Sequence, residues 1–350
     1  MSISARVTTG FADFLQGKNI SLLLSSPSNG QLLSIGCDQS GFSYDSVPCP
    51  KPMGISNCGN DLVICVDRSL KWFKLAPFNA AAEDIEADGY FASNTYMALH
   101  SNYVGEVDCH EVHLSCSGLI FAATKFNCIS TLDQSGYLSG LWHPSFIDRL
   151  VYEDRCHLNG FASDPSDKEN FIVSCHGQKN KAKSWIDSDL AQGCLLHSKH
   201  GFLLRNNVVM PHSPRIWHED IVFCNSGHGS LDLFDMKSLM HERVTKLPGF
   251  TRGLSILGNY AIVGYSKARE RFFTKDLPVF HSVNGHADLK CGLAIVDLLS
   301  GQILHALEFI SGIDELFDVQ VMPGPAPVKI IGLSYESDTQ VKNWADLIRF

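Results

Sequence analysis

The chain has 350 residues, a formal net charge of −9 and 45% hydrophobic residues, which is typical of a globular protein with a substantial core. No Lys/Arg-rich run interrupts the acidic balance, so the sequence lacks the positive surface that phosphate-backbone binding requires, and nucleic acid is not an expected partner. The first residues lack the pattern of an export signal, and no segment approaches 18 consecutive apolar residues. We therefore expect a cytoplasmic protein without a membrane partner.

Short apolar strands recur along the chain, and most are introduced by Gly, Asn or Asp. Residues 1–17 have helical character, and strand-like runs follow at 20–24 and 31–36. Further buried strands are predicted at residues 60–65, 118–122, 170–175, 220–224, 259–263 and 328–333. A second strand follows most of them, at residues 69–75, 128–132, 230–234 and 291–297, and residues 302–307 form an outer strand. Helical periodicity returns only at residues 343–348.

The repeated unit is a meander of about four antiparallel strands, which favours propeller blades over solenoid turns. We predict an all-β fold: a single β-propeller domain of about six four-stranded blades over residues 1–350. Residues 1–17 are an N-terminal extension, and the blades occupy 18–350. The first strands lack an inner partner and the last unit lacks outer ones, so the two termini are expected to share the sixth blade. Without crossover helices, a doubly wound α/β fold is excluded.

The strands just upstream of the repeated ones should be the innermost strands of the blades. Aligned on one another, they give a single column of residues, Met53, His110, His157, His212, Arg252 and Asp318. Equivalent positions of successive blades converge on one mouth of a central channel, so these side chains should surround a small-molecule site. Four neighbours are expected at the same mouth as substrate-binding residues, Glu111, Asn159, Arg215 and Glu315. His228, between two glycines, is a further candidate for substrate binding.

Three converging imidazoles favour a divalent transition metal, Zn, Fe, Cu or Ni, and His110, His157 and His212 are the predicted ligands. The same histidines could instead act directly as acid/base groups. Arg252 would clamp an anionic substrate, and Asp318 or Glu111 would serve as a fourth ligand or a base. A histidine taken alone is more often structural, so the site rests on the shared register of the three.

The sequence thus predicts an enzyme that acts on a small anionic metabolite, with His110, His157, His212, Arg252 and Asp318 as catalytic residues and no nucleotide cofactor. The alternative is a non-catalytic propeller that binds a small ligand or a protein partner. A calcium-dependent lactonase-like site is disfavoured, because calcium prefers oxygen ligands to imidazole. Reaction and substrate stay open.

Two further features bear on the site. The twelve cysteines are spread through the chain without a C-x-x-C pair, so we expect buried free thiols and no disulfide or zinc framework. Residues 266–290 are expected to form a long loop in the fifth blade, and its membership of the site is left open.

Four strings carry a resemblance to a known family: DRCHLNG at 154–160, MPHSPR at 210–215, GFTRGL at 249–254 and ELFDVQV at 315–321. With them the chain resembles a family of uncharacterised conserved hypothetical proteins that carry a domain of unknown function. The resemblance extends from about residue 50 onward. It implies a propeller-like fold and a polar site built from these strings, and it supplies no activity. His228 departs from the pattern of the family, which has another residue between the glycines.

Overall fold

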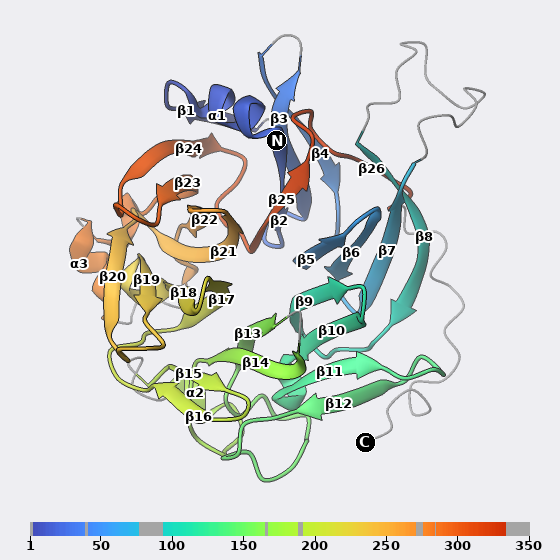
Figure 1. Ribbon diagram of the computed structural model, residues 1–350, viewed down its shortest axis with the longest axis vertical. Coiled ribbons are helices and arrows are strands. Elements are labelled where there is room, and N and C mark those ends of the chain that lie inside the picture. The colour runs from blue at the N-terminus through green and yellow to red at the C-terminus, as the bar shows by residue number, and fades with distance from the viewer. Residues whose placement is uncertain are drawn as a thin grey trace.

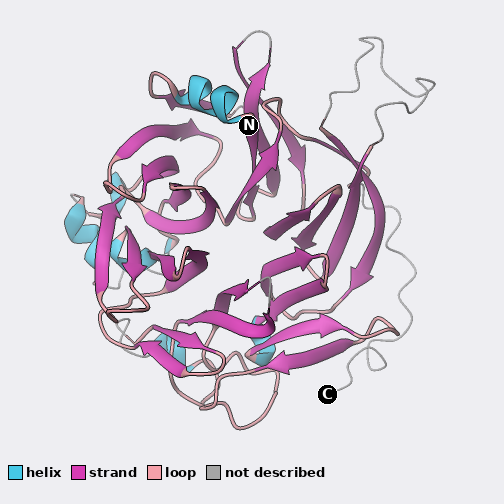
Figure 2. Cartoon of the chain, viewed as in Figure 1, coloured by secondary structure: helices cyan, strands magenta, loops and turns pink. Residues whose placement is uncertain are grey.

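The computed structural model describes residues 3–38, 41–76, 94–164, 167–187, 192–270, 276–283 and 285–333. Six sheets of four or five strands are arranged in a ring around a central axis (Figure 1), and strands predominate over helices throughout (Figure 2). The chain is therefore a six-bladed β-propeller, and the predicted fold is confirmed. The helical periodicity noted at residues 343–348 lies outside the described residues.

Blades 1 to 3 follow one another along the chain, and each begins with its innermost strand. Blade 1 contains β5 (Pro52–Cys58), β6 (Asp61–Val66), β7 (Ser69–Leu75) and β8 (Thr95–Tyr103), with β26 (Lys329–Ile331) at its edge. Blade 2 contains β9 (Cys109–Ser115), β10 (Gly118–Ala123), β11 (Cys128–Leu132) and β12 (Leu138–Trp142). Blade 3 contains β13 (Leu158–Asp164), β14 (Asp167–Cys175), β15 (Cys194–His197) and β16 (Gly201–Leu204).

Blades 4 to 6 complete the ring. Blade 4 contains β17 (Pro211–Trp217), β18 (Asp220–Asn225), β19 (Ser230–Phe234) and β20 (His241–Lys246). Blade 5 contains β21 (Phe250–Leu257), β22 (Tyr260–Ser266), β23 (Cys291–Asp297) and β24 (Ile303–Ser311), with β1 (Ser4–Val7) at its edge. Blade 6 contains β25 (Asp318–Pro323), β2 (Ile20–Ser26), β3 (Gln31–Asp38) and β4 (Gly41–Pro48).

Blade 6 joins the two ends of the chain. Its innermost strand β25 comes from the C-terminal part and pairs antiparallel with β2, from Ile20 opposite Pro323 to Ser25 opposite Asp318 (Figure 1). The predicted closure of the ring by a shared blade is confirmed. One predicted strand has a different role: residues 328–333 contain β26, which pairs parallel with the edge strand β8 of blade 1. It has the apolar composition of a second strand, but β2 already occupies that place in blade 6.

The core lies between neighbouring blades, which explains the uninterrupted apolar runs of the second strands. In β6, Leu62 and Ile64 belong to the core shared with blade 6, and Val63 and Cys65 belong to the core shared with blade 2. Because successive side chains of a strand point to opposite faces, both faces of each blade are buried and both sets must be apolar. These packed layers fix the inner strands around the channel.

Helices are short and lie outside the blades. They are α1 (Phe11–Lys18), α2 (Ser184–Asp187) and α3 (Pro278–Ser282), with 3-10 turns η1 (Thr124–Phe126), η2 (Ser226–His228) and η4 (His286–Asp288). Helix α1 buries Phe11 and Leu15 in the core between blades 5 and 6. No helix in the described ranges is long and apolar enough to cross a membrane. All twelve cysteines are free thiols, and ten of them are buried, as expected.

Candidate functional site

A cavity of about 390 Å³ opens at one mouth of the channel. The residues at the beginnings of five inner strands line it, Met53, His110, His157, His212 and Arg252. Beside each of these residues the pairing of the inner strand with the second strand shifts register. Such irregularities re-aim a side chain out of the regular sheet. The five residues of the predicted column therefore do meet at one mouth.

Asp318, the sixth member of that column, lies elsewhere. In blade 6 the pairing of β25 with β2 is regular, so the mouth position falls one residue earlier, on Phe317. The Phe317 ring lies 5.4 Å from the His110 ring and 3.3 Å from Cζ of Arg252. Asp318 is buried in the channel wall, where its carboxylate accepts hydrogen bonds from the backbone N–H groups of Ile55 and Val319, each at 2.8 Å. Its expected place at the mouth is corrected accordingly.

His110 and His212 are held by the same device in blades 2 and 4. Asp108 and Met210 lie two residues earlier in left-handed conformations, with φ of 56° and 52°. Their carbonyl oxygens lie 2.7 Å and 2.8 Å from Nδ1 of the respective histidine. A hydroxyl from the residue that directly follows the second strand also approaches each Nδ1: Thr124 Oγ1 at 3.0 Å from His110, and Ser226 Oγ at 2.7 Å from His212.

His157 is held by a carboxylate. Both oxygens of Asp154 lie 3.0 Å from its Nδ1, and the Trp185 ring stacks on the imidazole with 3.9 Å between centroids. Trp185 Nε1 also donates to Asp154, at 3.1 Å. Burial opposes ionisation of Asp154, but the charge and hydrogen bond of His157 outweigh it and lower the pKa of the carboxyl. An ionised carboxylate that orients an imidazole is the arrangement used by many histidine acid/base groups.

The structure adds a fourth histidine that the sequence comparison of inner strands missed. His176 directly follows β14, and its ring lies 4.6 Å from that of His157 and 4.8 Å from that of His212. It is 5% exposed, and neither ring nitrogen has a hydrogen-bond partner. Burial, followed by the nearby positive groups, lowers the pKa of His176 well below its usual value. An alignment of the residues that directly follow the second strands, Thr124, His176 and Ser226, would have revealed it.

The charge lining the cavity is opposite in sign to that of the whole chain. Among the described residues, six cations and three carboxylates line it, Lys51, Lys125, Lys183, Arg252, Lys267 and Arg269 against Asp108, Asp154 and Glu315. Each carboxylate already has a partner: Asp108 pairs with Lys51 at 3.1 Å, Asp154 with His157, and Glu315 with Arg269. An anion would therefore be attracted to this mouth.

Arg252 lines the cavity without an ion-pair or hydrogen-bond partner for its side chain among the described residues. No described residue accepts a hydrogen bond from its guanidinium, and Nη2 is buried. Burial and the charge of Arg269 lower the pKa of Arg252 to about 9, so the group is still charged at neutral pH. A buried charge that lacks a hydrogen-bond partner is costly unless a ligand supplies one. The guanidinium is thus ready to receive a carboxylate or phosphate.

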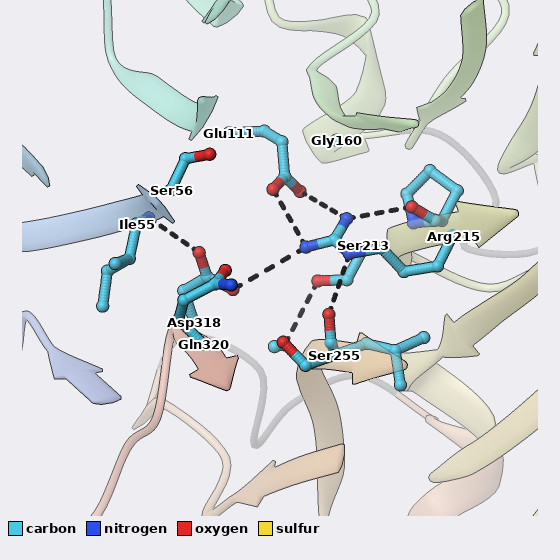
Figure 3. Close-up of polar contacts among 12 residues, drawn as sticks. Ile55, Ser56, Glu111, Gly160, Ser213, Arg215, Ser255, Asp318 and Gln320 are labelled. Carbon is cyan, nitrogen blue, oxygen red and sulfur yellow. Dashed lines mark hydrogen bonds and ion pairs between the residues drawn. The ribbon is translucent and has the colours of Figure 1, made fainter. Parts of the chain in front are cut away.

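A second polar cluster, Glu111, Arg215 and Asp318, lies in the channel wall and does not line the cavity (Figure 3). Arg215 donates to both Glu111 oxygens, at 3.0 and 3.3 Å, and lies 3.9 Å from Asp318. Burial raises the pKa of both carboxyls, that of Asp318 to about 7. These residues join blades 2, 4 and 6. They do not lie at the mouth, where contact with substrate was predicted.

The remaining predicted residues divide between the cavity and its surroundings. Glu315 lines the cavity. Asn159 is buried outside the lining, with Nδ2 unpaired. His228 lies on η2, where its Nε2 is buried without a partner, and it does not line the cavity either. The long loop of blade 5 does reach the site, because Lys267 and Arg269 belong to the lining; residues 271–275 and 284 of that loop are not described.

The predicted metal ligands share the cavity without forming a ligand set. Within the described ranges, no three His, Cys, Asp or Glu side chains are placed so that they could hold a metal ion together. The His176 ring packs against those of His157 and His212, at 4.6 Å and 4.8 Å between centroids, and the His110 and His157 rings meet edge to face at 78°. As they lie, these side chains do not fit a three-histidine metal centre.

Comparisons with known proteins add the fold and the family. No curated protein matches the sequence. Two solved structures share the fold: one titled as a nidogen/laminin complex (9% identity, TM-score 0.51, 86% of this chain and 98% of that one) and a protein of unknown function from Bacteroides caccae (11%, 0.52, 87% and 99%). A putative 6-phosphogluconolactonase from Bacteroides uniformis has a TM-score of 0.47 at 10% identity over 87% of this chain and 99% of that one, too distant to inform activity. The family model described as "Domain of unknown function (DUF4915)" matches residues 9–331, and the chain belongs to that family.

Proposed function

We propose that this protein is an enzyme that acts on a small anionic metabolite at the histidine-lined mouth of the channel. The observation that carries the proposal is Arg252, a half-buried residue whose guanidinium has no hydrogen-bond partner among the described residues and lies against Phe317, in a cavity where cations outnumber carboxylates. Arginine binds carboxylate and phosphate groups through its planar fork of donors. Arg252 would anchor the anionic group, and the four histidines would surround the rest of the molecule.

His157 is the acid/base group in this proposal. Its Nδ1 is held by Asp154, so Nε2 is the nitrogen that can take a proton from a bound molecule or return one. The ionised carboxylate stabilises the imidazolium that forms, and Trp185 covers one face of the ring. His110, His176 and His212 are neutral at pH 7, because burial lowers their pKa values, and they serve as polar contacts.

A metal-dependent reaction is the second candidate, and one observation favours it. His110, His157 and His212 each engage a carbonyl or carboxylate oxygen through Nδ1, which is how proteins commonly orient histidines that bind a metal through Nε2. A metal centre would require the rings to move from their present arrangement. Elemental analysis of untagged protein, alongside the His157→Ala/His212→Ala variant, decides between the two: bound Zn, Fe, Cu or Ni that the variant lacks supports the metal-dependent reaction.

The proposal is tested first by ligand binding. A panel of small carboxylates and phosphates is screened by thermal shift, and Kd values of the hits are measured by calorimetry. We expect Arg252→Met to weaken binding about 10- to 150-fold, since a hydrogen bond to a charged group contributes roughly 1.5–3 kcal/mol. Arg243→Met, at an exposed position outside the cavity, is the matched control.

Turnover separates an enzyme from a binding module. Each bound compound is incubated with wild-type protein and with His157→Gln, and conversion is followed by NMR. Conversion that His157→Gln abolishes without loss of binding supports the catalytic role. Binding without conversion of any compound indicates a propeller that only binds its ligand, and absence of any Arg252-dependent binding refutes the proposed anion site.

A further inference from the structure

The hydrogen bonds of His110 and His212 determine where their ring protons lie. Each Nδ1 faces a backbone carbonyl oxygen, which can only accept. Each also faces a hydroxyl whose single proton is already donated to another carbonyl: Thr124 to Leu158, at 2.7 Å, and Ser226 to Thr251. Both groups at each Nδ1 therefore accept, so Nδ1 must carry the proton. Nε2 of a neutral ring is then a bare acceptor.

His157 presents the same atom to the cavity. The ionised Asp154 accepts from its Nδ1, which leaves Nε2 as the remaining nitrogen. No group in the described part of the chain is hydrogen-bonded to Nε2 of His110, His157 or His212. The mouth thus offers three imidazole acceptors that the fold has oriented and left without donors, beside the unpartnered guanidinium of Arg252.

The fitting ligand must donate hydrogen bonds and carry negative charge. Ammonium groups would donate, but six lining cations and three carboxylates that already have partners disfavour a positive ligand. Hydroxyl groups donate without bringing charge.

We infer that the site binds a polyhydroxylated anion, a sugar-acid-like molecule whose hydroxyls donate to the histidines while its carboxylate or phosphate binds Arg252. This inference rests on the proposed anion site and adds the substrate class. The cavity volume of about 390 Å³ is within the range of small-molecule sites. The tautomers determine the selectivity for hydroxylated molecules, because a molecule without hydroxyls would leave the Nε2 acceptors of the histidines unsatisfied.

The first experiment measures binding of matched pairs to the full chain. D-gluconate is compared with hexanoate, and sorbitol 6-phosphate with n-hexyl phosphate, so that each pair differs in hydroxyls and keeps the anionic group. We expect the hydroxylated member of at least one pair to bind at least about tenfold more tightly, and the pair that shows the preference identifies the anionic group. Equal binding within both pairs overturns this inference and leaves the anion site standing. Failure of all four to bind overturns the inference; only a wider panel without Arg252-dependent hits overturns the anion site as well.

The second experiment reads the tautomers directly and needs no ligand. In ¹⁵N-labelled protein, imidazole NMR spectra distinguish rings protonated on Nδ1 from those protonated on Nε2, and variants of each histidine give the assignment. We expect Nδ1–H for His110 and His212. The Thr124→Val/Ser226→Ala variant keeps the backbone carbonyl acceptors at both rings, so it should keep Nδ1–H at His110 and His212. Nε2–H rings at His110 and His212 in the wild type would overturn the inference whatever the ligands do.

Discussion

His110 makes the folded protein sensitive to acid in a way that one substitution isolates. Burial lowers the pKa of His110 to about 3, and the charge of Asp108 offsets this only in part. In the unfolded chain a histidine titrates near 6.5, so between pH 6.5 and 3 the unfolded state binds a proton that the folded state refuses. The stability from neutral His110 is therefore complete above pH 6.5 and is lost as the pH falls toward 3.

The size of the effect follows from the interval between the two pKa values. A histidine that stays neutral in the folded protein lowers the unfolding free energy by about 2 kcal/mol when the pH falls from 7 to 5. For His110 we expect about 1–2 kcal/mol, because part of its ring meets the cavity. His110→Phe removes the titrating group and keeps a ring beside Phe317. The unfolding free energy of the variant should consequently fall by about 1–2 kcal/mol less than that of the wild type between pH 7 and pH 5.

Urea unfolding at pH 7, 6 and 5, followed by the fluorescence of the five tryptophans, measures the difference. His100→Phe is the control, since His100 is exposed and its ring stacks on Trp72, a contact that phenylalanine can keep. The comparison is between pH dependences, so a constant loss of stability in a variant does not affect it. Equal pH dependence of His110→Phe and the wild type would refute the reasoning.

Three further outcomes are expected. Arg215→Met leaves Glu111 and Asp318 buried without their cation, so its unfolding free energy at pH 8, measured in urea, should be about 3–5 kcal/mol below that of the wild type. The difference should shrink at pH 5, where the carboxyls take up protons. A difference below about 1 kcal/mol at pH 8 would contradict this. Asp318 should titrate near pH 7 in ¹³C NMR of the folded protein. Because its pKa is raised above the unfolded value, its contribution to stability is present below pH 4 and is lost as the pH rises through 7. A titration near pH 4 would exclude this raised pKa. Gly253→Ala should lower the unfolding free energy by about 1–3 kcal/mol more than Gly59→Ala. Both glycines have positive φ, but only at Gly253 would a Cβ meet backbone atoms, those of Asp318 at 2.9 Å. Equal losses in thermal unfolding would show that the contact relaxes.

The blades could be predicted because their second strands are buried on both faces. Runs such as residues 62–66 must be apolar throughout, and this signal survives the weak similarity between repeats. Residues 328–333 have the same composition, yet β26 lies at an edge beside β8. Apolar composition reports burial and does not report which strand will be the neighbour.

The candidate site was predictable where the pairing irregularity recurs and not where it is missing. The register shifts beside His110, His212 and Arg252 place equivalent residues at the mouth. In blade 6 the strand is regular, and because side chains alternate along a strand, a one-residue error placed Asp318 where Phe317 lies. The fold instead places the phenylalanine ring there, against the guanidinium of Arg252.

Other parts of the site gave no signal within the inner strands. His176 directly follows the second strand β14, outside the inner strands whose alignment gave the predicted column. Trp185 belongs to α2, in a connection between β14 and β15 that has no counterpart in the repeat. Its contact with His157 depends on the path of that connection through space, which the spacing of residues along the chain does not encode.

The shared blade also means that one sheet cannot be completed until the end of synthesis. Strand β2 leaves the ribosome early, but its inner partner β25 is made about 300 residues later, which at roughly 5–20 residues per second is a delay of about 15–60 seconds. For that time one edge of β2 has no neighbour, and an unpaired apolar edge is where chains associate wrongly. Newly made protein should therefore depend on chaperones until Asp318–Pro323 arrives, and a slowed ribosome would lengthen the exposure.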